Sequence, residues 1–169
     1  TPKFLKTIIF SKNLYKALPN LENALYTIQD SIDQVETMDL TARVHLVEDD
    51  DAVRESLEMM LESIGFETLT FANASEFLGA YNQEMAGCIV LDIRMPGMDG
   101  MELQRELNQI NSLLPIIFVT GHGDVPMAVE AMQQGAVDFV QKPYREQELL
   151  GKIQRAMALN EENRSSLQQ

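Results

Sequence analysis

The sequence is poor in cysteine, in basic side chains and in long apolar runs. Cys88 is the only cysteine among 169 residues, which excludes an intrachain disulfide and favours a reducing compartment. Lys and Arg number 13 against 26 Asp and Glu, so a net charge of −13 argues against unaided binding to nucleic acid, whose phosphates require clustered positive charge. No apolar run approaches the length of a membrane-spanning helix. We therefore expect a cytoplasmic protein that contacts neither a membrane nor DNA directly.

The composition is that of a globular protein, with 45% hydrophobic and 23% charged residues. The length suits one ordinary domain with an appendage. We predict three parts: an N-terminal helical segment over residues 1–40, an α/β domain over 41–160, and a polar tail or the start of a linker over 161–169.

Residues 1–40 carry apolar side chains at alternating spacings of four and three, the pattern of one face of an amphipathic helix. These side chains are Leu14, Leu18, Leu21, Leu25, Ile28, Ile32 and Val35. Pro19 interrupts the pattern and predicts a kink or a new helix start there. Two interpretations stay open: a helix or hairpin packed on its own domain or on a second copy, and a signalling dimerisation helix. We favour the first slightly, because two to three heptads are marginal on their own.

From residue 43 onward, short apolar runs alternate with amphipathic helical patterns. The runs lie at 43–47, 68–71, 88–92, 115–119 and 137–140. Polar residues with capping chemistry, Asn73, Asp99 and Asp124, precede three of the helical patterns, and a last helix is expected to end near residue 159. Five strands that alternate with five helices predict a doubly wound parallel sheet covered on both faces.

Polar side chains stand where four of these runs end: Glu48 and Asp49, Asp92, Thr120, and Lys142. In a flavodoxin-like strand order these ends share one edge of the sheet. Three carboxylates there would repel each other, and Mg²⁺, with Mn²⁺ as an alternative, would relieve that repulsion with oxygen ligands. The carboxylate of Asp92 can then attack a phosphoryl group, while Lys142 and Thr120 offset the new charge. Each residue alone has an ordinary explanation as a turn, cap or surface residue, but the set in this order does not.

Four stretches resemble the receiver domain of two-component response regulators, and the third is similar to the FixJ-like subfamily. They read VEDD at 47–50, LDIRMPGMDG at 91–100, VTGHGDVPMAVEAM at 119–132 and VDFVQKP at 137–143. The resemblance covers roughly residues 42–159. It implies a five-stranded parallel sheet of order 2-1-3-4-5 with five helices.

The resemblance also implies a role for individual residues. Asp92 matches the phospho-acceptor, and its metal site would use Asp49 directly, Glu48 through water and the backbone carbonyl of Arg94. Thr120 matches the switch hydroxyl, Lys142 the phosphate-binding lysine, and Phe139 the switch aromatic, while the Lys142–Pro143 peptide bond is expected to be cis. Glu48 replaces a commoner Asp and Gly121 a commoner Ala.

By this resemblance, the chain would accept a phosphoryl group from a sensor histidine kinase rather than act as an enzyme on other substrates. Phosphorylation would change the face formed by the helix at 124–134, the strand at 137–140 and the last helix, and so control a homodimer or an output domain. In FixJ-like regulators a helix-turn-helix output domain would follow residue 169. None is present in this sequence, so we expect no direct DNA binding by this chain.

Three alternative functions fit the sequence less well. A haloacid-dehalogenase-like phosphatase needs a second Asp two residues after the nucleophile, where this chain has Arg94. A flavin-binding module needs a Ser/Thr-rich phosphate loop after the first strand, which here is acidic. A receiver used only for docking would not need Thr120 and Lys142 in place.

Overall fold

The computed structural model describes residues 41–121 and 124–167. The predictions for residues 1–40, including the apolar repeat, lie outside the described residues. Among the helices of the described part, none combines the length and the apolar character needed to cross a membrane.

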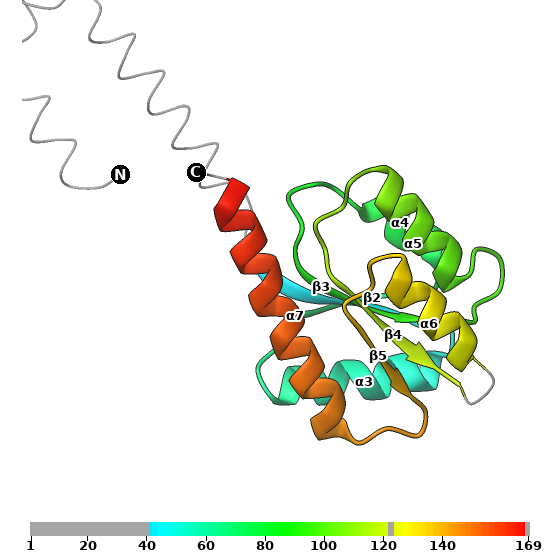
Figure 1. Cartoon of the computed structure of the whole chain (residues 1–169). Helices are drawn as coiled ribbons and strands as arrows, with labels where there is room; N and C mark the ends of the chain where they lie inside the picture. Colours follow the sequence, from blue (N-terminus) through cyan, green and yellow to red (C-terminus); the bar gives the residue numbers. More distant parts are fainter. Residues whose placement is uncertain (1–40, 122–123, 168–169) are drawn as a thin grey trace, which may run out of the picture. The chain divides into compact units, whose positions relative to one another are not determined.

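Five strands and five helices alternate along the described chain, as the sequence predicts (Figure 1). In chain order they are β1 Ala42–Val47, α3 Asp51–Ser63, β2 Thr68–Phe71, α4 Ala74–Ala80, β3 Ala86–Asp92, α5 Gly100–Gln109, β4 Ile116–Thr120, α6 Val125–Gln133, β5 Asp138–Gln141 and α7 Glu146–Leu167. The strands form one sheet of order β2-β1-β3-β4-β5, and every neighbouring pair is parallel. The predicted flavodoxin-like fold and its strand order are confirmed.

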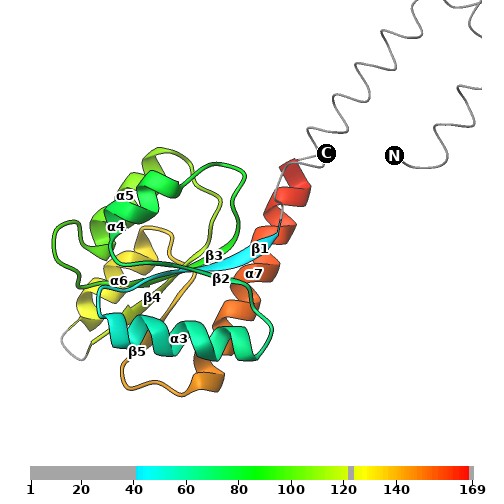
Figure 2. The same cartoon turned by 180° about the vertical axis from the view of Figure 1, so that it is seen from behind.

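Helices α3 and α7 cover one face of the sheet, and α4, α5 and α6 cover the other (Figure 2). The central strand β3 shows why: Cys88 and Val90 pack with α3 and α7, whereas Ile89 and Leu91 pack with the other three helices. Successive residues of a strand point to opposite faces of the sheet. Because helices cover both faces, all four side chains are buried. Burial of each large apolar side chain contributes about 1.5–3 kcal/mol, which holds both helical layers on the sheet.

The helix starts follow the sequence at two of the three predicted caps, Asn73 and Asp99, and Asp50 also caps a helix. The side chains of Asp50, Asn73 and Asp99 each accept a hydrogen bond from a backbone N–H in the first turn of α3, α4 and α5. Asp124 is different, because it occupies the capping position of α6 but makes no side-chain capping bond. The prediction that Asp124 caps this helix is therefore wrong, and its carboxylate has other partners.

Helix α7 is longer than the sequence predicts. The polar composition from residue 160 onward suggested a tail, but the helix continues to Leu167. Polar side chains tie this end to the domain: Asn160 is buried and bonded to backbone groups on both sides, and Arg164 donates to the carbonyl of Met85 at 3.1 Å. These contacts replace the apolar stripe that sequence patterning relies on.

Candidate metal centre at the carboxyl edge of the sheet

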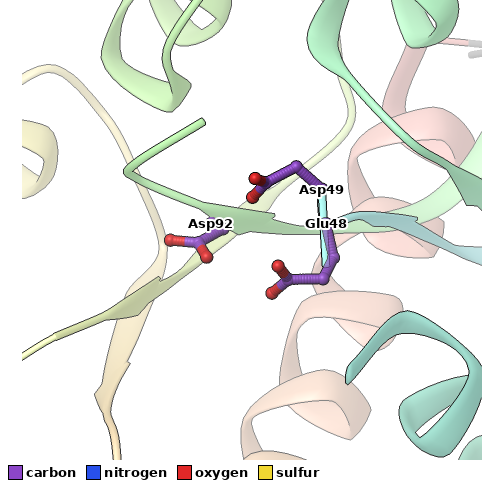
Figure 3. A group of neighbouring side chains, drawn as sticks. All are labelled: Glu48, Asp49 and Asp92. Carbon is purple, nitrogen blue, oxygen red and sulfur yellow. The ribbon is translucent and has the colours of Figure 1, made fainter. Parts of the chain in front are cut away.

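Three carboxyl groups meet where β1 and β3 end (Figure 3). The register pairs Val47 with Leu91, so Glu48 and Asp49, which follow β1, lie beside Asp92 at the end of β3. One oxygen from each of the three side chains lies within 4.8 Å of the others. Glu48 is buried, Asp92 is half-buried and Asp49 is exposed, so the group opens to solvent on one side.

Lys142 places its ammonium group in contact with two of these carboxylates. Its Nζ lies 3.3 Å from Oδ2 of Asp92 and 3.4 Å from Oε2 of Glu48. Burial by itself would lower the pKa of Lys142, but the negative charges of Asp92 and Glu48 outweigh it and raise that pKa. The peptide bond to Pro143 is cis, as the resemblance implied, and the backbone N–H of Lys142 donates to the carbonyl of Thr120 at 2.7 Å.

Glu48 is held firmly at the base of the group. Burial raises the pKa of its carboxyl group and the nearby Asp92 adds to that rise, whereas the N–H of Asp50 and the ammonium of Lys142 act against it. Oε1 accepts from that N–H at 3.1 Å. Arg54 of α3 donates to the backbone carbonyl of Glu48 at 2.9 Å. Sequence reasoning missed Arg54, although its place one turn into the helix after the acidic run could have indicated the contact.

Two predicted switch residues have their contacts with groups other than the three carboxylates. Thr120 ends β4 and is fully buried, and its hydroxyl donates to the carbonyl of Val140 at 3.2 Å. Phe139 lies on β5, packs against the layer of α4, α5 and α6, and has Nζ of Lys152 5.9 Å from its ring centre. The described structure thus brings four of the predicted residues together: Glu48, Asp49, Asp92 and Lys142. Thr120 on β4 and Phe139 on β5 do not contact this group through any of the bonds given above.

Arg94 links this group to the neighbouring loop. Its backbone N–H donates to Oδ1 of Asp92 at 3.1 Å, and its guanidinium forms an ion pair with Asp124. The donor set is made of carboxylate oxygens, and the ion pairs that these three carboxyl groups form within the described residues come from one ammonium, so their negative charge is not fully balanced there. This chemistry fits a small hard cation such as Mg²⁺, which prefers oxygen ligands.

Comparison with known proteins decides the family. Residues 44–154 match the response regulator receiver domain family. The chain belongs to this family. Receiver domains are the signalling modules of two-component response regulators. The group of acidic residues at one edge of the sheet therefore lies in a signalling domain.

Known response regulators share much of this sequence. Response regulator protein TodT of Pseudomonas putida is 46% identical over 128 residues, which cover 76% of this chain and 56% of TodT. Transcriptional regulatory protein FixJ of Bradyrhizobium diazoefficiens is 44% identical over 120 residues, or 71% of this chain and 58% of FixJ. The receiver chain therefore spans a little more than half the length of these curated relatives.

Solved structures of response regulators share the fold. The structure of StyR has a TM-score of 0.72 and 49% identity, over 75% of this chain and 64% of StyR. The FixJ-N structure has a TM-score of 0.66 and 44% identity, over 70% of this chain and 94% of FixJ-N. The receiver fold of residues 41–167 thus has close relatives in both sequence and structure.

Proposed function

We propose that this receiver domain accepts a phosphoryl group on Asp92 from a sensor histidine kinase, in a reaction that requires Mg²⁺. The observation that carries the proposal is the placement of Lys142 Nζ 3.3 Å from Asp92 Oδ2, within a group of three carboxylates. A phosphoryl-accepting carboxylate needs a positive partner that stays charged, and the raised pKa of Lys142 provides one at neutral pH.

In the proposed reaction, an oxygen of the Asp92 carboxylate attacks phosphorus in line with the departing imidazole. The new P–O bond forms as the P–N bond to the kinase histidine breaks, and the leaving nitrogen keeps the electron pair. Bound Mg²⁺, held by Asp49, Asp92 and the carbonyl of Arg94 with Glu48 acting through water, would offset the negative charge of the approaching phosphoryl group. Lys142 then pairs with the phosphoryl oxygens.

The proposed output is a change in the face formed by α6, β5 and α7. A phosphoryl group adds about −1.5 to −2 units of charge and strong acceptors, which can draw the Thr120 hydroxyl from its present partner, the carbonyl of Val140. Phe139 could then fill the space that Thr120 leaves. We propose that this change controls a homodimer or a transcriptional output domain, as the name of the transcriptional regulatory protein FixJ suggests.

Three further parts of the proposal rest on the family and the sequence. The domain acts in the cytoplasm, where histidine kinases present their phosphoryl groups. The chain does not itself bind DNA, because the net charge of −13 over its 169 residues opposes contact with phosphates. We also propose that residues 1–40 serve in dimerisation or docking and that residues 161–169 lead toward a linker.

Intact-mass spectrometry after treatment with acetyl phosphate and Mg²⁺ tests the proposal. We expect the wild-type chain to gain one phosphoryl group that is labile to base, and the Asp92→Asn variant to gain none. The matched control is Asp99→Asn, because Asp99 lies on the same connection but caps α5, a task that Asn performs equally well. The control should be phosphorylated like the wild type.

The same measurement separates the alternatives. A wild-type chain that gains no phosphoryl group with Mg²⁺ would contradict the proposal and favour a docking module. Steady turnover of unrelated phosphomonoesters would contradict it in favour of a phosphatase.

A further inference from the structure

Asp124 uses its carboxylate in a way that its sequence position does not predict. It is 4% exposed, and it stands at the capping position of α6 without capping the helix. Its Oδ1 accepts from Nε of Arg94, and its Oδ2 accepts from the backbone N–H of Gly121 at 3.2 Å. The N–H of Asp124 in turn donates to the carbonyl of Gly121 at 3.1 Å. Two reciprocal bonds therefore tie Gly121, directly after β4, to Asp124.

Arg94 connects this pair of bonds to the acceptor carboxylate. The backbone N–H of Arg94 donates to Asp92, while its side chain reaches Asp124 on the other connection. The Arg94 side chain is 69% exposed, so burial does not force it into this position, and the pairing with the buried Asp124 orients it. An unbroken series of contacts thus runs from Asp92 through Arg94 and Asp124 to Gly121, the residue after Thr120.

Two donors at the end of β4, the strand that pairs with β3, are already engaged by protein acceptors. The Thr120 hydroxyl donates to Val140, and the N–H of Gly121 donates to the carboxylate of Asp124. Among the three donors Thr120, Gly121 and Lys142, Lys142 is the one that donates to Asp92. A phosphoryl group brings new acceptor oxygens, and each donor that turns toward them must first leave its present partner. The carboxylate of Asp124 therefore competes with a phosphoryl group for the N–H of Gly121.

Glycine at position 121 fits this arrangement. A Cβ at this position would lie 3.2 Å from Oδ2 of Asp124, closer than most side-chain carbons approach an oxygen. A side chain at this position would therefore require the carboxylate to shift by a few tenths of an ångström, and glycine lets it keep its bond to the N–H of residue 121 without that shift. Glycine instead of the commoner Ala at position 121 and the use of Asp124 as an acceptor for its N–H are therefore consistent with each other.

We propose that Arg94 and Asp124 form a latch that holds Gly121, and with it the end of β4, in the unphosphorylated arrangement. Asp124 is a positioning residue, and Arg94 keeps its carboxylate in place. Release of the latch frees the N–H of Gly121 and shifts the domain toward the arrangement that accepts a phosphoryl group. This inference rests on the proposed phosphorylation of Asp92.

The test compares Arg94→Ala, Asp124→Asn and the double variant with the wild-type chain. Arg94→Ala keeps the backbone N–H and carbonyl of residue 94 and removes only an exposed side chain. Asp124→Asn keeps the shape but offers one acceptor oxygen for two donors. The control is Glu67→Gln, which breaks an ion pair with Arg43 that lies outside these contacts. Should Asp124→Asn fail to fold, Arg94→Ala alone still tests the latch.

The first readout is the affinity for beryllofluoride, a phosphoryl mimic, measured by fluorine NMR with Mg²⁺. A latch predicts that both single variants bind it about five- to tenfold more tightly, and that the double variant gains no more than the better single one. Simple electrostatics predicts opposite effects, because Arg94→Ala removes a positive charge and Asp124→Asn a negative one. Opposite or additive effects would overturn the latch.

The second readout is hydrogen exchange of the Gly121 amide in the metal-free chain. We expect it to exchange about five- to tenfold faster in both single variants than in the wild type and in Glu67→Gln. An unchanged Gly121 amide would overturn the latch even if phosphorylation of Asp92 is correct. A wild-type chain that binds no beryllofluoride would instead refute the proposed function, so the two failures are distinct.

Discussion

His45 shows how a single buried side chain can make stability depend on pH. It lies on β1 and is 2% exposed, with Nδ1 3.1 Å from the carbonyl of Cys88 and its ring edge-on to Phe77. Burial lowers the pKa of His45, the hydrogen bond to Cys88 acts in the opposite sense, and the charge of Arg43 lowers it further. The neutral ring is therefore the form that fits the core.

This lowered pKa predicts the direction of a pH effect. The unfolded chain binds the His45 proton more readily than the folded one, so the stability present above the ordinary pKa of 6.5 is lost as pH falls below it. Urea unfolding should show the wild type losing stability faster than His45→Gln between pH 7.5 and 5.5. The difference in slope cannot exceed about 1.4 kcal/mol per pH unit, the limit for one proton. Equal slopes in the two proteins would contradict the prediction.

At the same scale, the single charge of Lys142 does not neutralise the three carboxylates of the site. Its ammonium contacts both Glu48 and Asp92, but the third carboxylate, Asp49, is exposed and near the other two. In the part of the chain that the structure describes, one positive charge pairs with this group of three carboxylates, which favours the binding of a cation at this edge of the sheet.

At the scale of elements, the start of α5 is packed tightly against the end of β3. The N–H of Gly100 donates to the carbonyl of Ile93 at 2.9 Å. A Cβ on Gly100 would lie 2.4 Å from the backbone oxygen of Asp92, a distance that backbone atoms can relieve only by moving. Glycine is therefore required where the helix meets the strand that carries Asp92.

A pair of glycine substitutions tests this packing. Gly100→Ala should reduce the free energy of unfolding by about 1–3 kcal/mol through overpacking, and slow phosphorylation of Asp92 by displacing its backbone. Gly151→Ala is the matched control, since Gly151 lies in α7 with open space around it. There the same change should stabilise by about 1 kcal/mol through helix propensity. Denaturant unfolding and acetyl phosphate kinetics provide the measurements, and equal effects of the two substitutions would exclude the packing explanation.

At the scale of the whole molecule, Asn160 fastens the C-terminal half of α7 to the sheet. Its Oδ1 accepts from the N–H of Gly87 and its Nδ2 donates to the carbonyl of Leu113, both at 2.9 Å. Gly87 lies at the start of β3 and Leu113 precedes β4, so one side chain connects the helix to two segments far from it in the sequence. We expect the direction of α7 after Asn160 to depend on this connection.

Removal of Asn160 should loosen this end of the molecule. In Asn160→Ala the buried N–H of Gly87 and the carbonyl of Leu113 lose their partner, so the free energy of unfolding should fall by about 1–3 kcal/mol. Amides of α7 after residue 156 should also exchange faster in hydrogen-exchange measurements. Asn108→Ala is the control, because its exposed side chain makes one bond, to the carbonyl of Gln134, and should cost less. A loss no larger than in the control would show that α7 is held by its apolar contacts alone.

Local patterns in the sequence were sufficient for the elements and for most of the candidate site. Alternating runs, and caps such as Asn73 and Asp99, depend on residues a few positions apart. The strand ends that carry Glu48, Asp92 and Lys142 meet once the sheet is parallel. The recognisable motifs supplied the strand order and the cis peptide bond before Pro143. These features follow from near neighbours and from topology.

Only the tertiary structure decided which partner each polar side chain takes. Arg94 and Asp124 are 30 residues apart and Gly87 and Asn160 are 73 apart, so no local pattern reveals either contact. Asp124 gives up its capping bond because Arg94 and Gly121 offer two donors at once. The physical reason is that backbone preferences act within a few residues, whereas a polar group that becomes buried must be satisfied by whatever the fold brings next to it.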